Sequence, residues 1–130
     1  PSFYPQDAFA KAKVQELIRH MELYIELPAR RLYGDLFFGR PVSDEEKAKV
    51  KELLEKGFTS FAKLARYDPY IAGSEITYAD FFFCFSVGIA TTVCKKAFDW
   101  DAYNEIPHIR ELLDTLNERE SVKRAQVDRV

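Results

Sequence analysis

Positions 81 to 94 are mostly apolar and contain no charged residue, within the longer stretch 73–96. No face of a helix with this pattern is suited to water, so the pattern predicts a buried central helix surrounded by other helices. The uncharged run is too short to cross a bilayer, which needs about 20 residues. The stretch therefore indicates the core of a globular domain and no membrane span.

Two local signals mark the start of this helix. Thr77 can accept a hydrogen bond from a free backbone N–H, and Asp80 stands where its carboxylate can reach back to the Thr77 N–H, which together make a capping box. Ile76 and Phe81 occupy the N′ and N4 positions of a hydrophobic staple. Capping accounts fully for Asp80, so we interpret it as a structural residue and not as a catalytic acid.

Apolar residues at helical spacing predict a long first helix that begins after the N-cap Asp7 and runs to about Tyr33. Pro28 lies inside this pattern and removes a hydrogen bond to the Tyr24 carbonyl, so the helix should bend in its last turns. The glycines and proline of residues 34–41 predict a loop. Three apolar side chains of this loop are expected to tuck against neighbouring helices: Leu36, Phe37 and Phe38.

Ser43 opens a second capping box, of the form S-x-x-E, so a helix is expected to begin there and to end at Asp68-Pro69. Gly57 lies inside this helix, where it costs about 1 kcal/mol relative to alanine, which favours a close helix crossing. The apolar positions of the helix form its core face: Val50, Leu53, Leu54, Phe58, Phe61, Leu64 and Ala65.

After the central helix, residues 97–105 predict a polar and aromatic connection, and Pro107 suits the first position of the next helix. A last short helix is expected over residues 121–128. No stretch alternates with a period of two, and no repeat of 20 to 50 residues is evident. The predicted fold class is therefore all-α, a five-helix or six-helix bundle around the buried central helix.

The composition fits one domain over residues 1–130. The chain is 47% hydrophobic and 31% charged with a net charge of −2, which gives no sign of attraction to nucleic acid or to an anionic membrane. Cys84 and Cys94 would lie about 15 Å apart along one helix, too far for a disulfide bond. Two unpaired cysteines fit a reducing compartment, so the expected location is the cytoplasm.

Few residues suggest chemistry of their own. His20 and His108 have no companion at metal-ligand spacing, so no metal site is predicted. Cys84 and Cys94 lack a neighbouring histidine or a basic helix N-terminus, which favours inert thiols. Aromatic residues make up 15% of the chain, and several could line the core, an apolar pocket or a dimer contact: Tyr24, Tyr33, Phe37, Phe38 and Trp100.

The order of these features resembles the C-terminal helical domain of cytosolic glutathione S-transferases of the bacterial type. A long first helix and a capped second helix precede the motif GSEITYAD, which opens a buried third helix, and the segment P-x-I-x-E-L-L…E-S-V-K-R-A closes the chain. The resemblance covers nearly the whole chain. Its most specific part is the capping box with its staple, which supports folding in that family.

This resemblance implies that an N-terminal thioredoxin-like domain, absent from this chain, binds glutathione and activates its thiol. No catalytic residue and no cofactor are then expected in this chain, and glutathione is the co-substrate of the parent protein. The resemblance further implies that Arg30, Arg31 and Ile89 line the pocket for a small electrophilic substrate. The resemblance also implies a homodimer of the parent protein that uses the first two helices, whereas the oligomeric state of this chain alone stays open. Nucleic acid and membrane are not expected partners.

Two interpretations stay open at this level. Arg30 and Arg31 could bind a carboxylate of a ligand, or they could be solvated side chains at a helix end. The domain itself could serve a transferase, or it could be a non-enzymatic interaction module like those of translation factors, synthetases and starvation regulators. A free-standing bundle without a ligand is a third possibility, because the fold alone does not choose among functions.

Overall fold

The computed structural model describes residues 3–106 and 108–128, which form no strand and six helices, when a π-helical turn and the α-helices on either side of it are counted as one helix. This confirms the predicted all-α fold. Pro107, expected at the start of a helix, lies outside the described residues. In chain order the elements are α1 (Ala8–Met21), η1 (Glu22–Glu26), α2 (Leu27–Arg30), α3 (Tyr33–Phe38), α4 (Asp44–Leu64), α5 (Tyr78–Phe82), η2 (Phe83–Val87), α6 (Gly88–Phe98), η3 (Ala102–Glu105), α7 (Ile109–Asn117) and α8 (Glu120–Asp128).

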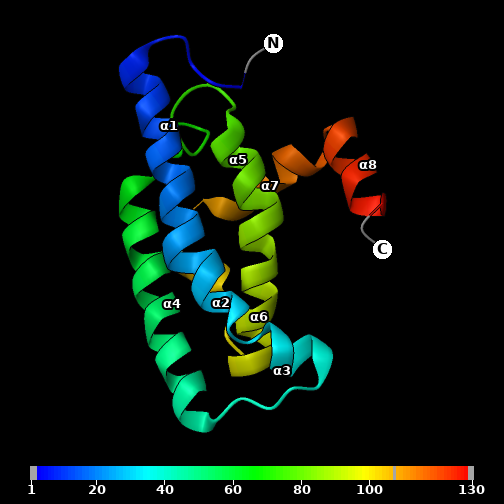
Figure 1. Ribbon diagram of the computed structural model, residues 1–130. Coiled ribbons are helices and arrows are strands. Elements are labelled where there is room, and N and C mark those ends of the chain that lie inside the picture. The colour runs from blue at the N-terminus through cyan, green and yellow to red at the C-terminus, as the bar shows by residue number, and fades with distance from the viewer. Residues whose placement is uncertain (1–2, 107, 129–130) are drawn as a thin grey trace.

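Three long helical rods make up the body of the domain. The first consists of α1, the π-helical turn η1 and α2, the second is α4, and the third consists of α5, the π-helical turn η2 and α6. Figure 1 shows these rods side by side, with α7 and α8 beside the α5 end of the third rod and α3 beside its α6 end. The first rod contacts both other rods, so the core lies where the three meet.

The helix starts predicted from capping residues are confirmed for the first two rods. The Ala10 N–H donates to Asp7 Oδ2 at 2.9 Å, and the Glu46 N–H donates to Ser43 Oγ at 3.1 Å. Each bond satisfies one of the backbone donors that a helix leaves free at its N-terminus. The predicted last helix is also present as α8, with Val122 buried.

The first rod leaves α-helical geometry just before Pro28. In η1 the Leu27 N–H donates to the Glu22 carbonyl, five residues back. Pro28 has no N–H to offer the Tyr24 carbonyl, so the regular pattern cannot continue through this turn. The turn brings the Tyr24 carbonyl against α4 at Gly57, where an added Cβ would overlap the carbonyl oxygen. The close helix crossing expected at Gly57 is therefore confirmed.

Two local expectations were wrong. Residues 33–38 form the short helix α3 and not a loop, because Gly39 adopts a left-handed conformation with φ of 65° and the Arg40 N–H closes the end on the Gly34 carbonyl at 2.8 Å. Leu36 packs against the core as expected, but Phe38 is 70% exposed. Leu64, expected on the core face of α4, is 40% exposed because it is the last residue of that helix.

The central rod is only partly enclosed, which corrects the expectation that helices surround it. Its inner side is buried, whereas on its outer side Tyr78 is 44% exposed and Phe81, Phe85 and Ile89 are half-buried. Helices α1 and α4 cover one side, while the opposite side is covered only near its ends, by the small helices (Figure 1) and by Phe3, whose ring packs against Tyr78 and Phe81. The middle of this side is a partly exposed apolar surface.

The whole central rod, Tyr78–Phe98, is longer than its uncharged run. With 21 residues and a mean hydropathy of 1.4 it is, by length and composition, the one described helix that could cross a membrane. Its contacts with α1 show that it also serves as a core helix of the folded domain. The core helix of a soluble protein meets the same criteria, so this finding is weak evidence for a membrane span.

Candidate functional site

An apolar groove lies between the first rod and α4. It has a volume of about 720 Å³. Its apolar part includes three side chains that point outward from the first rod and are 47%, 55% and 41% exposed: Leu23, Tyr24 and Leu27. We call this the η1–α4 groove, and its lining residues are His20, Leu23, Tyr24, Leu27, Pro28, Arg31, Leu53, Lys56, Gly57 and Ser60. Leu23, Tyr24 and Leu27 lie outside the inward-facing apolar stripe of the first helix, and this position is the signal in the sequence that could have indicated the groove.

His20 and Ser60 form the polar part of the groove floor. His20 Nε2 and Ser60 Oγ are hydrogen-bonded at 2.8 Å, and Ser60 Oγ also lies 2.9 Å from the Lys56 carbonyl. His20 Nδ1 is buried without a hydrogen-bond partner. Burial lowers the pKa of His20 from its ordinary value of 6.5, and the charge of Glu16 partly opposes this by raising it. Burial therefore favours the neutral form of His20.

The three residues expected to line a co-substrate pocket do not converge on this groove. Arg31 lines it at one end and forms an ion pair with Glu46 at 3.7 Å. Arg30 points elsewhere, is exposed and binds Glu26 of the preceding turn. Ile89 lies on the partly open outer side of α6. Both arginines thus have carboxylate partners on the surface, and the pocket assignment stays a prediction.

Asp80 joins the start of the central rod to the preceding loop. The Ala79 N–H donates to Thr77 Oγ1 at 3.3 Å and the Thr77 N–H donates to Asp80 Oδ2 at 2.8 Å, so both halves of the capping box are present. Asp80 Oδ1 accepts a further bond from the Ile71 N–H at 3.0 Å. Burial raises the pKa of Asp80, while its hydrogen bonds lower it. Both oxygens of the carboxylate accept hydrogen bonds from backbone N–H groups, which supports a structural role. Contact between Ile76 and Phe81, the staple, stays a prediction.

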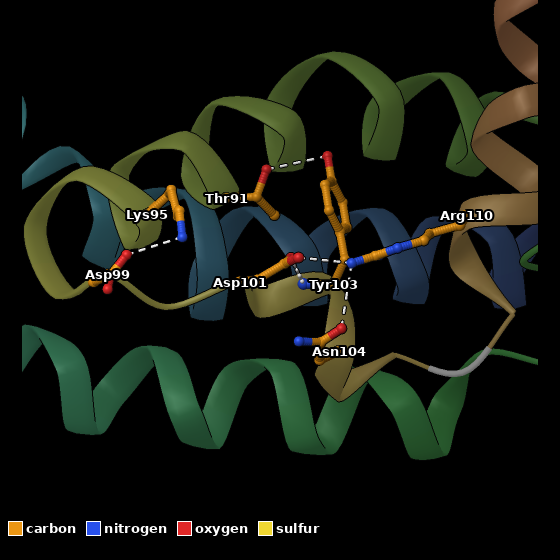
Figure 2. Close-up of polar contacts among 7 residues, drawn as sticks. All are labelled: Thr91, Lys95, Asp99, Asp101, Tyr103, Asn104 and Arg110. Carbon is orange, nitrogen blue, oxygen red and sulfur yellow. Dashed lines mark hydrogen bonds and ion pairs between the residues drawn. The ribbon is translucent and has the colours of Figure 1, made fainter.

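A polar network that sequence reasoning missed connects α6, η3 and α7 (Figure 2). Arg110 donates to Asp101 at 2.6 Å and to Asn104 at 3.2 Å, and its guanidinium lies over the Tyr103 ring at 5.7 Å. The Tyr103 hydroxyl lies 3.1 Å from Thr91 Oγ1 on α6. These bonds join η3 to α6 and to α7, so the network holds η3 in place.

A second cavity of about 380 Å³ lies at the other end of α1. Its walls come from the lead-in at Phe3, from α1 at Val14 and from the loop before the central rod at Ile76. Lys13 and Glu16 at its edge form an ion pair with each other at 3.5 Å. In the described residues no group of three or more His, Cys, Asp or Glu side chains could hold a metal ion.

Both cysteines are thiols on the central rod, Cys94 buried and Cys84 half-buried. Burial raises the pKa of the Cys94 thiol to about 12. In a Cys84→Ser variant at pH 8, we expect native Cys94 to react with an aromatic disulfide reagent at least about 100-fold more slowly than in denaturant, because so little thiolate is present. The rate of thiolate release followed by absorbance tests this. Equal rates in both conditions would contradict the buried, inert thiol.

These features define a helical domain whose central rod, capped by Thr77 and Asp80, has one partly open side. The glutathione S-transferase C-terminal domain family matches residues 30–125. The chain belongs to this family, which confirms the resemblance seen in the sequence.

A glutathione S-transferase from Pseudomonas putida strain F1 is 41% identical over 125 residues. The match covers 96% of this chain and 57% of the length of that relative. The present chain therefore corresponds to little more than half of a whole transferase.

Proposed function

We propose that this chain is the C-terminal domain of a glutathione S-transferase-like enzyme and supplies the hydrophobic wall of its co-substrate pocket. The open side of the central rod carries the proposal. Tyr78 is 44% exposed and Ile89 is only partly buried, so part of an uncharged helix face meets water. A second domain placed against this face would complete a pocket with one apolar wall, which suits a small electrophile with an apolar body. Membership of the family supports this placement.

The chemistry of the proposed reaction belongs to the other domain. There the thiolate of glutathione would attack an electrophilic carbon, so that a C–S bond forms and the leaving group departs with the electrons of its bond. In this chain, Cys94 is kept protonated and Asp80 is bound to backbone N–H groups, so neither is available as a nucleophile or a base. The role of this domain would be to bind and orient the electrophile on the apolar face of the central rod.

The isolated chain is expected to show no conjugation of glutathione to 1-chloro-2,4-dinitrobenzene above the uncatalysed rate. Activity should appear when a thioredoxin-like transferase domain is joined ahead of the chain. Replacing Ile89 with aspartate should then raise KM for the electrophile at least about tenfold, because a charge replaces apolar surface in the pocket wall. Thr59→Asp, at an exposed position of α4 away from this face, is the matched control. Turnover by the isolated chain, or equal KM values for both variants, would contradict the proposal.

We also infer that two copies of the chain associate through the η1–α4 groove. Its apolar centre, Leu23, Tyr24 and Leu27, is partly exposed and is bordered by Arg31 and Lys56. An apolar centre with a polar rim is the usual composition of a protein interface.

The expected working environment is the cytoplasm, where thiols stay reduced. The alternative function, a non-enzymatic interaction module of the same fold, would use the same groove and the same open side for protein partners. Conjugation of glutathione by the two-domain protein distinguishes these two functions. An interaction module would show no conjugation even with the electrophile or glutathione in excess.

A further inference from the structure

Three segments that are far apart in the chain meet at the start of the central rod. In the lead-in, residues 3–7, the Phe3 ring packs edge-on against two rings of α5. Its centroid lies 5.6 Å from that of Tyr78 and 5.0 Å from that of Phe81. Arg119, in the turn between α7 and α8, places its guanidinium over the Phe3 ring at 5.8 Å and over the Phe81 ring at 5.7 Å. One cation therefore joins the lead-in to the central rod.

The lead-in also makes a backbone contact with this rod. The Tyr78 N–H donates to the Phe3 carbonyl at 3.1 Å. A backbone N–H in the first turn of a helix has no acceptor within that helix, so the lead-in supplies the acceptor that Tyr78 uses. The Tyr4 ring lies against the Tyr78 ring with centroids 4.7 Å apart, and Lys11 of α1 lies over the Tyr4 ring at 5.7 Å.

The two rings are the partners of the Arg119 charge. Within residues 3–106 and 108–128 this guanidinium forms no ion pair. A guanidinium over an aromatic face is attracted by the negative potential of the ring. It stays charged at every ordinary pH, so this contact does not depend on protonation.

The lead-in is also one wall of the 380 Å³ cavity at the end of α1. Phe3, Tyr4 and Pro5 line this cavity together with α1 and residues 72–77 of the loop before α5. If the lead-in moved away from the rod, the cavity would lose this wall and the Tyr78 N–H would lose its acceptor.

We propose that Arg119 is a latch that keeps the lead-in closed over the start of the central rod and over this cavity. Because the latch comes from the turn before α8, the last helices of the chain control a segment at its beginning. A domain joined ahead of the chain would be connected through the lead-in, so the latch would also limit the movement of that domain. This last consequence rests on the proposed function, whereas the latch itself consists of contacts within this chain.

The test is amide hydrogen exchange of the 130-residue chain, followed by NMR. Arg119→Met keeps the apolar stem of the side chain and removes its charge, so the Tyr78 N–H should exchange at least about fivefold faster than in the wild-type chain. The Thr77 N–H, bonded to Asp80 Oδ2, should change less than about twofold because the capping box lies outside the latch. Arg119→Lys keeps a cation and should restore most of the protection. Arg124→Met, the same substitution at an exposed position of α8, is the matched control and should match the wild-type chain.

A second substitution identifies the ring that the latch holds. Phe3→Leu removes this ring and keeps an apolar side chain, so Arg119→Met should accelerate Tyr78 exchange less in this background than in the wild-type chain. Wild-type exchange of Tyr78 in the Arg119→Met chain overturns the latch. So does an equal acceleration at Tyr78 and Thr77, which would indicate general unfolding, or an equal effect of Arg119→Met in both backgrounds. Conjugation by the two-domain protein tests the proposed function separately, so either idea can fail without the other.

Discussion

Replacing Gly57 with alanine is expected to lower the free energy of unfolding by about 3 kcal/mol, because the new methyl group would overlap the Tyr24 carbonyl oxygen. The oxygen belongs to the backbone of η1 and cannot rotate away, so α4 and the first rod must separate. Gly57 also lines the η1–α4 groove, and the same separation should weaken dimerisation. Urea unfolding followed by circular dichroism measures the first effect, and sedimentation at pH 7.5 measures the second.

Gly88 provides the matched control on the central rod. It is also helical, but nothing lies within 4 Å of the position its Cβ would take. Gly88→Ala should therefore raise the free energy of unfolding by up to about 1 kcal/mol, since alanine is the better helix former. If both substitutions change stability by the same amount, intrinsic helix propensity and not the helix crossing governs Gly57.

Asp80→Ala is expected to cost about 3 kcal/mol or more, well above the roughly 1 kcal/mol of an ordinary helix cap. The substitution leaves two buried donors, the Ile71 and Thr77 N–H groups, without an acceptor. Ser43→Ala removes an exposed cap of α4 and serves as the control, with an expected cost of about 1 kcal/mol. Urea unfolding of both variants at pH 7 measures the difference, and equal costs would mean that the Ile71 bond contributes nothing.

The pH dependence of Asp80 has a defined sign. Its pKa is raised from the ordinary value of 3.8, mainly by burial. Between that value and the higher folded-state pKa, the native chain binds more protons than the unfolded chain, so this group's contribution to stability falls as pH rises. The cost of Asp80→Ala should therefore be larger at pH 4 than at pH 7. An opposite trend in the unfolding free energies would show that the hydrogen bonds outweigh burial.

His20 and Asp80 illustrate why buried groups in this domain serve different purposes. Each carboxylate oxygen of Asp80 accepts a hydrogen bond from a backbone N–H, so the group is tied to the surrounding backbone. His20 has one satisfied nitrogen and one buried nitrogen without a partner. A fully satisfied group stabilises one arrangement, whereas a half-satisfied group is sensitive to any change in its charge.

The sequence alone determined most of the helices and the family of this protein. The caps Asp7, Ser43 and Thr77 were predictable because each bonds to the backbone two or three residues away, and the uncharged run after Thr77 required a shared core. The resemblance to transferase C-terminal domains rested on the same local motifs. Hydrogen bonds and periodicity of short range can be read from a sequence because neighbours in the chain are neighbours in the helix.

Only the tertiary structure decided what lies between the helices. Three contacts join residues that are not related by helical spacing in the sequence. They are the bond from Ile71 to Asp80, the pairing of His20 with Ser60, and the contact of Gly57 with the Tyr24 carbonyl. The open side of the central rod was missed for the same reason, since an uncharged pattern does not tell how many helices are present to cover it. Burial and long-range pairing depend on how the rods pack, and packing is a property of the whole chain.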